Sequence, residues 1–88
     1  NPFNPLTAIA YTLSGQSTVT LKVHNSLGQE IATLVDQTQS AGHYEVGWNG
    51  RNSNGNQVSS GVYFYRLEAK NNSAAGGFVQ MRKMTLLK

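Results

Sequence analysis

Cysteine is absent from this 88-residue sequence, proline occurs twice, and charged residues make up only 12% of the chain. Without cysteine there is no disulfide, thiolate metal ligand or cysteine nucleophile, so the fold must rest on packing. The lysines and arginines are spread along the chain and form no basic stripe with interleaved aromatics. No apolar run is long enough for a signal peptide or a membrane span. We therefore expect neither a nucleic-acid partner nor membrane insertion.

Groups able to perform catalysis are also scarce. Two of the four acidic residues, Glu45 and Glu68, fall on positions that alternation directs to solvent, which leaves no visible carboxylate pair. His24 and His43 fall on outward positions of different predicted strands and lack the spacing of zinc ligands or a catalytic triad. No glycine-rich phosphate loop opens a helix. The sequence predicts a protein that is not an enzyme and uses no cofactor.

One loop has the spacing of a metal site but not its chemistry. Residues 49–57 read NGRNSNGNQ, and their oxygen-bearing side chains are spaced like those of a calcium loop. Calcium prefers charged carboxylates, whereas the asparagines here are neutral. Two Asn-Gly pairs favour positive φ and tight reversal of the chain. We interpret the segment as a turn and predict no metal.

What the sequence does contain is a series of short alternating segments separated by turn signals, with no helical spacing. Strands are expected at residues 7–13, 18–25, 30–35, 43–48, 61–69 and 78–87, and residues 1–5 are expected to be a linker end that becomes the first strand. A turn is expected from Asn25 to Gly28. The predicted fold is all-β, an immunoglobulin-like antiparallel sandwich of about seven strands, forming one domain over residues 1–88.

Strand phase also selects the core. The candidate core residues of the later strands are Tyr44, Val46, Trp48, Tyr63, Tyr65 and Leu67. Those of the first two regular strands are Ile9, Tyr11, Leu13, Val19, Leu21 and Val23. In the last strand Val79 and Met81 oppose Met84 and Leu86 in phase, and a bulge near Arg82 would reconcile them.

Five segments, taken in order, carry a family resemblance: NPFNP at 1–5, Leu27-Gly28, WNGR at 48–51, SGVYFYRL at 60–67 and RKMTLLK at 82–88. Together they span nearly the whole chain and resemble the type A C-terminal sorting domain of the type IX secretion system. The same pattern is similar to the immunoglobulin-like domain of the flagellar hook-capping protein.

The resemblance to the sorting domain implies a fragment or processed piece of a larger secreted protein. Such a domain is recognised by the type IX translocon in the outer membrane, and the protein reaches the cell surface or the medium after periplasmic transit. The resemblance places the recognition candidates in the terminal segment: Arg82, Lys83, Met84, Leu86, Leu87 and Lys88. A departure is that asparagines stand in the loop after Trp48 where many members have aspartates, which puts a metal role there further in doubt.

Two further functions stay open. The chain is alternatively a structural or adhesive immunoglobulin-like module that assembles with its own copies into a surface filament. In that case Met84 and Leu86 simply close the core, and the lysines keep the last strand soluble. A carbohydrate-binding role would need a row of exposed aromatics, but alternation leaves only Phe64 and Phe3 outside.

Overall fold

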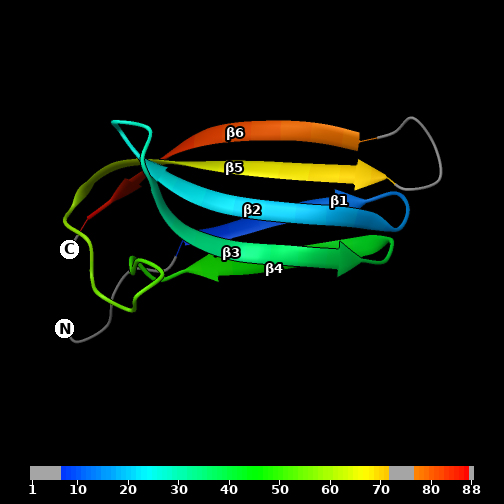
Figure 1. The fold of residues 1–88 in the computed structure, drawn as a ribbon, viewed down its shortest axis with the longest axis horizontal. Helices are drawn as coiled ribbons and strands as arrows, with labels where there is room; N and C mark the ends of the chain where they lie inside the picture. The colour runs from blue at the N-terminus through cyan, green and yellow to red at the C-terminus, as the bar shows by residue number, and fades with distance from the viewer. Residues whose placement is uncertain (1–6, 72–76, 88) are drawn as a thin grey trace.

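Alternation of apolar and polar side chains produces six strands in the computed structural model, which describes residues 7–71 and 77–87. The strands are β1 (Thr7–Leu13), β2 (Ser17–Asn25), β3 (Glu30–Gln39), β4 (Gly42–Trp48), β5 (Gly61–Asn71) and β6 (Gly77–Leu86). They form two antiparallel sheets that pack face to face as a sandwich (Figure 1). Nowhere in those two ranges is there a helix able to span a bilayer. The all-β immunoglobulin-like prediction is confirmed, with six strands in the described ranges against about seven expected. Residues 1–5, expected as a linker end that becomes the first strand, lie outside the described residues.

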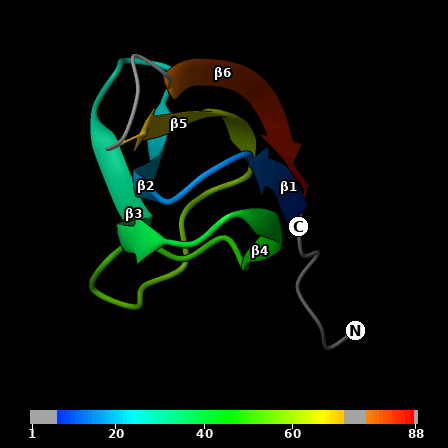
Figure 2. The ribbon, with the colours of Figure 1, turned by 90° about the vertical axis from the view of Figure 1, so that its right-hand side faces the viewer.

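The larger sheet has the order β3-β2-β5-β6, and the smaller one pairs β1 with β4. β2 is an inner strand that pairs with its sequence neighbour β3 on one side and with the distant β5 on the other. β3 and β6 are the two edges of the larger sheet (Figure 2). Each edge strand has one ladder partner among the described residues, so one row of its backbone groups faces away from the sheet.

The core lies between the sheets and is built from inward-facing side chains of all six strands. Its fully buried members include Trp48 of β4, Ile9 of β1 and Leu21 and Leu67 of the larger sheet. Burial of large apolar side chains such as these contributes roughly 1.5–3 kcal/mol each relative to exposure. Trp48, Tyr63, Tyr65 and Leu67 are buried, as alternation predicts.

Tyr44 and Val46 require a correction, because both are only partly buried and pack against the margin of the core. Their phase is the expected one, but they are less well covered than Ile9, Tyr11 and Leu13 of the partner strand β1, which are buried. The Tyr44 ring stacks on Tyr11 of β1, with ring centroids 5.4 Å apart. Its hydroxyl donates a hydrogen bond to the Ser40 carbonyl at 2.7 Å. The pair closes one margin of the sandwich.

The bulge expected near Arg82 is wrong. The β5–β6 ladder runs without a shift from Gly61 opposite Leu86 to Lys70 opposite Gly77. Met84 and Leu86 face the core, whereas Val79 and Met81 lie on the outer face with 54% and 60% of their surface exposed. The opposed phases therefore need no extra residue, because β6 presents apolar side chains on both faces. Register shifts occur instead in the β2–β3 ladder.

Both described ends of the domain meet at one end of the sandwich (Figures 1 and 2). Thr7, which begins β1, pairs with Trp48 at the end of β4. Two residues further on, Gly50 adopts a φ of 77° and packs so closely that a Cβ there would lie 3.2 Å from Cδ2 of Leu86. Leu86 ends β6, so the start of the first strand and the end of the last converge on the segment after Trp48.

Candidate binding surface

The outer face of the larger sheet carries the side chains that the core does not use. The ladders place His24, Phe64 and Lys83 in one row across β2, β5 and β6. The next row is Lys22, Arg66 and Met81, followed by Thr20, Glu68 and Val79. Neighbouring side chains on one face of a sheet are close enough to contact one another. The face therefore combines cations with exposed apolar groups.

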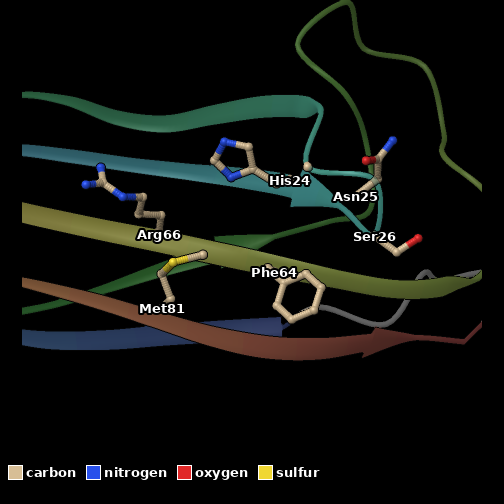
Figure 3. Close-up of a pocket in the computed structure, with 7 residues that line it drawn as sticks. His24, Asn25, Ser26, Phe64, Arg66 and Met81 are labelled. Atoms are coloured by element: carbon tan, nitrogen blue, oxygen red, sulfur yellow. The ribbon is translucent and has the colours of Figure 1, made fainter.

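An open groove of about 410 Å³ lies on this face, at the end nearest the β2–β3 turn (Figure 3). It is lined by His24, Asn25, Ser26, Gly28, Phe64, Arg66 and Met81. In Figure 3, Phe64 and Met81 lie along β5 and β6, while Asn25 and Ser26 come from the turn. A groove of this size is at the small end for a ligand pocket. Because it is open, it suits one or two side chains of a protein partner better than an enclosed small molecule.

The turn that forms one wall of the groove is fixed by Asn25. Its side-chain oxygen accepts hydrogen bonds from the backbone amides of Leu27 at 2.9 Å and Gln29 at 3.0 Å. The Gly28 amide donates to the Asn25 carbonyl at 3.0 Å, and Gly28 has a φ of 85°. Asparagine at the start of a turn and glycine at the left-handed position are the residues this geometry favours. The predicted turn is confirmed, and it projects Leu27 into solvent with 83% exposure.

Ion pairs neutralise much of the charge on the outer face. Lys22 Nζ lies 3.3 Å from a Glu30 oxygen, and Arg66 Nη1 lies 3.3 Å from a Glu68 oxygen, with Lys70 Nζ 4.0 Å from the other oxygen of Glu68. A hydrogen bond from the Thr33 hydroxyl, together with Lys22, lowers the pKa of Glu30 from its ordinary value. Surface pairs of this kind add little to stability, because solvent screens them. Their carboxylates are thus occupied by neighbouring cations.

The two histidines have unlike surroundings. His43 Nδ1 lies 2.8 Å from the Thr12 hydroxyl across the β1–β4 ladder. His24 lines the groove, and its Nδ1 is buried without a hydrogen-bond partner in the described part of the chain. An unpaired buried polar atom costs about 1–3 kcal/mol. His24 is therefore the least well satisfied polar side chain of this surface.

The asparagine loop is organised by its own hydrogen bonds. The Asn52 side-chain oxygen accepts from the amides of Asn54 and Asn56, each at 3.0 Å. The Gly55 amide donates to the Asn52 carbonyl at 2.9 Å, with Gly55 at a φ of 86°. The Asn52 oxygen that a cation would need is therefore already an acceptor of backbone donors. Across residues 7–71 and 77–87, no three His, Cys, Asp or Glu side chains gather into a potential metal site.

The terminal recognition candidates fall into two groups. Met84 and Leu86 are 7% and 2% exposed and belong to the core, as the structural alternative expects. Arg82, Lys83 and Leu87 are exposed at the edge strand or just after it, and Lys88 lies outside the described residues.

The described residues do not form the row of exposed aromatics that carbohydrate binding would need. Phe64 and Phe78 occupy opposite faces of the sheet, because Phe78 pairs with the buried Ala69, so they do not form one aromatic row. Phe3 lies outside the described residues.

Sequence reasoning placed His24 and Phe64 outside but did not bring them together with Met81. The groove depends on which strands are neighbours, and β2 pairs with β5 across a long stretch of sequence. The signal in the sequence is the phase of Val79 and Met81, which is opposite to that of Met84 and Leu86 and marks a second apolar surface on β6.

Comparison with known proteins identifies the architecture. The chain matches the family model of the FlgD Ig-like domain over residues 5–73. No curated protein sequence matches it. Among solved structures, the crystal structure of FlgD from P. aeruginosa is similar to this chain with a TM-score of 0.62 and 23% identity, covering 94% of this chain and 60% of that one. At this identity the likeness establishes the fold. These matches support the hook-capping similarity expected from the sequence and do not support the type IX sorting resemblance.

Proposed function

Because the chain belongs to the family of FlgD Ig-like domains, we propose that it is a structural module of a larger secreted or cell-surface protein and performs no catalysis. In this role the domain is a stable β-sandwich whose surface contacts other proteins. The chain covers 60% of the FlgD structure that it resembles, so the proposal concerns the Ig-like domain and not the activity of the whole FlgD protein.

The observation that carries this proposal is the division of labour between the two faces of the larger sheet. The inner face buries Leu21, Tyr65 and Leu67 against the smaller sheet. The outer face exposes Val79 and Met81, flanked by the half-buried Phe64. Exposed apolar clusters rimmed by polar groups are typical of protein interaction sites. The polar groups around them serve in turns and ion pairs.

A domain exchange in the longer protein tests the structural role. The domain is deleted, replaced by an unrelated β-sandwich of similar size, or destabilised by Trp48→Ala. We expect deletion and Trp48→Ala to reduce retention of the protein at the surface, and the unrelated sandwich to restore it at least in part. Equal retention of the intact and deleted forms would contradict a structural role.

Type IX sorting remains a second candidate because of one observation, the position of β6. It is an edge strand with exposed Arg82 and Lys83, and an edge can be captured by another sheet through strand addition. In this candidate the translocon is the partner and the protein reaches the surface through the periplasm. The domain exchange separates the two, because an unrelated sandwich cannot replace a signal that a translocon recognises.

A further inference from the structure

We propose that copies of this chain join edge to edge, with β6 of one copy adding to β3 of the next, so that the four-stranded sheets run on from copy to copy. This inference rests on the proposed structural function and names its partner, a second copy of the chain. The two surfaces are the outward backbone rows of the edge strands, here called the β3 edge (residues 34–39) and the β6 edge (residues 80–85).

Strand direction permits this junction without turning the sheet over. The larger sheet contains four antiparallel strands in the order β3-β2-β5-β6, so its two edge strands run in opposite directions. A second copy displaced sideways in the plane of the sheet therefore presents β3 antiparallel to β6 of the first. The inner and outer faces stay on the same sides in both copies. The alternation of strands continues through the junction as it does within the sheet.

The β3 edge is bounded by a loop that covers its first part. The Ser53 amide donates to the Ile31 carbonyl at 3.1 Å, and the Thr33 amide donates to the Ser53 hydroxyl at 3.4 Å. Within the described ranges, no loop backbone bonds to residues 34–39. The loop thus occupies the positions where a neighbouring strand would otherwise begin and leaves a stretch of about one ordinary strand length.

The charges of the two edges are of opposite sign. β3 contains Glu30 and Asp36 but no lysine or arginine, whereas β6 contains Arg82 and Lys83 but no acidic residue. Asp36 and Lys83 are exposed, and neither is in an ion pair among residues 7–71 and 77–87. Both lie on the outer face, Asp36 through its pairing with Thr20 and Lys83 through its pairing with Phe64.

Placing Asp36 of one copy opposite Lys83 of the next gives a consistent register. In an antiparallel ladder it brings Val35 opposite Met84, and both of these side chains face the core in their own copy. The next pair on the inner side is Gln37 with Arg82, both of which are exposed. Each pair therefore joins side chains of compatible polarity on the same face.

Edge charges also protect sheets from aggregation, and lysine is frequent in that role. If the charges served only to prevent edge-to-edge association, charges of one sign on both edges would be more effective, because every pair of edges would then repel. Here two β3 edges repel each other, two β6 edges repel each other, and only the unlike edges attract. The resulting contact is head-to-tail, which builds open chains instead of closed dimers.

Charge reversal tests the junction in the 88-residue chain itself, with sedimentation velocity at low and high salt and circular dichroism as the check of folding. We expect the unmodified chain to form larger assemblies as its concentration rises. These should dissociate at high salt, because salt screens the attraction between the charges of the two edges. Asp36→Lys and Lys83→Glu should each weaken association by at least about tenfold, because like charges then face each other. The control for Lys83→Glu is Lys70→Glu, which lowers the net charge by the same amount but lies on the inner strand β5.

Combining the two charge reversals is the strongest test of the junction. The double variant Asp36→Lys/Lys83→Glu again has unlike edges and should recover association, and so should an equimolar mixture of the two single variants. A chain that is monomeric at millimolar concentration and low salt would overturn the junction, and so would association indifferent to either reversal. A monomeric chain that still supports surface retention in the domain exchange would remove the junction alone and leave the structural role intact.

Discussion

The ring of Trp48 meets the ring of Tyr63 edge-on, with centroids 5.2 Å apart and planes inclined by 66°. Trp48 belongs to β4 and Tyr63 to β5, so this contact joins the two sheets. Each ring also satisfies its polar atom, because Trp48 Nε1 donates to the Arg51 carbonyl at 3.0 Å and the Tyr63 hydroxyl donates to the Ser59 carbonyl at 2.7 Å. The pair fixes both sheets to the loops at one end of the sandwich.

Trp48→Ala should lower the free energy of unfolding by about 3–5 kcal/mol, the usual cost of truncating a large buried aromatic. Trp48 is 1% exposed and spans the space between the sheets. Urea denaturation followed by circular dichroism measures the change. Leu27→Ala is the control, because Leu27 is 83% exposed and its loss should cost little. Stability of Trp48→Ala close to that of the unmodified chain would refute the assigned strand phase.

Tyr63→Phe should cost about 0.5–1.5 kcal/mol, since it deletes one hydrogen bond and leaves the ring in place. The hydroxyl donates to the Ser59 carbonyl just before β5. Tyr65→Phe is a matched control two residues along the same strand, because Tyr65 is buried to a similar degree and makes no such bond in the described part of the chain. Denaturation curves of the two variants should separate clearly, and coincident curves would show that the hydroxyl bond contributes nothing.

Gly50→Ala should destabilise the domain more than Gly55→Ala. Both glycines have left-handed backbones, with φ of 77° and 86°, and alanine there costs about 1–2 kcal/mol. Only Gly50 adds a packing conflict, because its Cβ would lie 3.2 Å from Leu86 Cδ2, whereas nothing lies within 4 Å of a Cβ at Gly55. Overpacking adds about 1–3 kcal/mol. Thermal denaturation compares the two, and equal losses would place Leu86 away from Gly50.

The stability of the domain should fall in acid partly through Glu30. The Thr33 hydroxyl at 3.0 Å and the Lys22 ammonium at 3.3 Å lower the pKa of this carboxyl below its ordinary value of 4.5. A depressed folded-state pKa adds stability above the unfolded pKa, and that stability is lost as the pH falls through the folded value. Glu30→Gln should therefore flatten the dependence of unfolding free energy on pH below about 5. Thr33→Val should flatten it in part, and unchanged slopes in both variants would disprove the assignment.

Deleting Leu87 and Lys88 should leave the domain folded, with a change within about 0.5 kcal/mol, the usual range for surface positions. Leu87 is 70% exposed, while Met84 and Leu86 remain to close the core. Fusion of both forms to a periplasmic reporter, in a host with a working type IX system, then tests the sorting candidate. If that candidate holds, the intact domain leads to export; loss of export on deletion then places the signal in the last two residues, and unchanged export places it elsewhere on the sandwich, for example on the β6 edge. Retention of both fusions in the periplasm would remove it.

Most of the strands could be predicted from the sequence, because period-two alternation is local. Val19, Leu21 and Val23 fixed the phase of β2, and Arg66 and Glu68 fixed that of β5. The length of β3 was underestimated, since residues 36–39 are polar at an edge and carry no alternation signal. Tyr44 and Val46 lie in the expected phase but are only partly buried, because alternation predicts which face a side chain takes and not how completely the opposite sheet covers it.

The candidate binding surface was harder to predict from the sequence, for a physical reason. Its members come from β2, β5 and β6, and the pairing of β2 with β5 is not encoded in any local pattern. Once that pairing is known, His24, Phe64 and Met81 fall on one face at adjacent positions. The same holds for the opposite charges of Asp36 and Lys83, which gain meaning only when β3 and β6 are recognised as the two edges of one sheet.

The convergence of the first and last strands at the segment after Trp48 has a mechanical consequence. Thr7 is paired with Trp48, and Leu86 packs on Gly50 two residues later, so the points where β1 begins and β6 ends lie on the same end of a body 44 Å long. Tension applied between these two points would act across that end and peel strands from it one hydrogen bond at a time. It would not shear the ladders along their whole length. Most of the domain would therefore lie to one side of the axis along which force acts. The force needed to unfold it would depend on the contacts of residues 48–50 with Thr7 and Leu86.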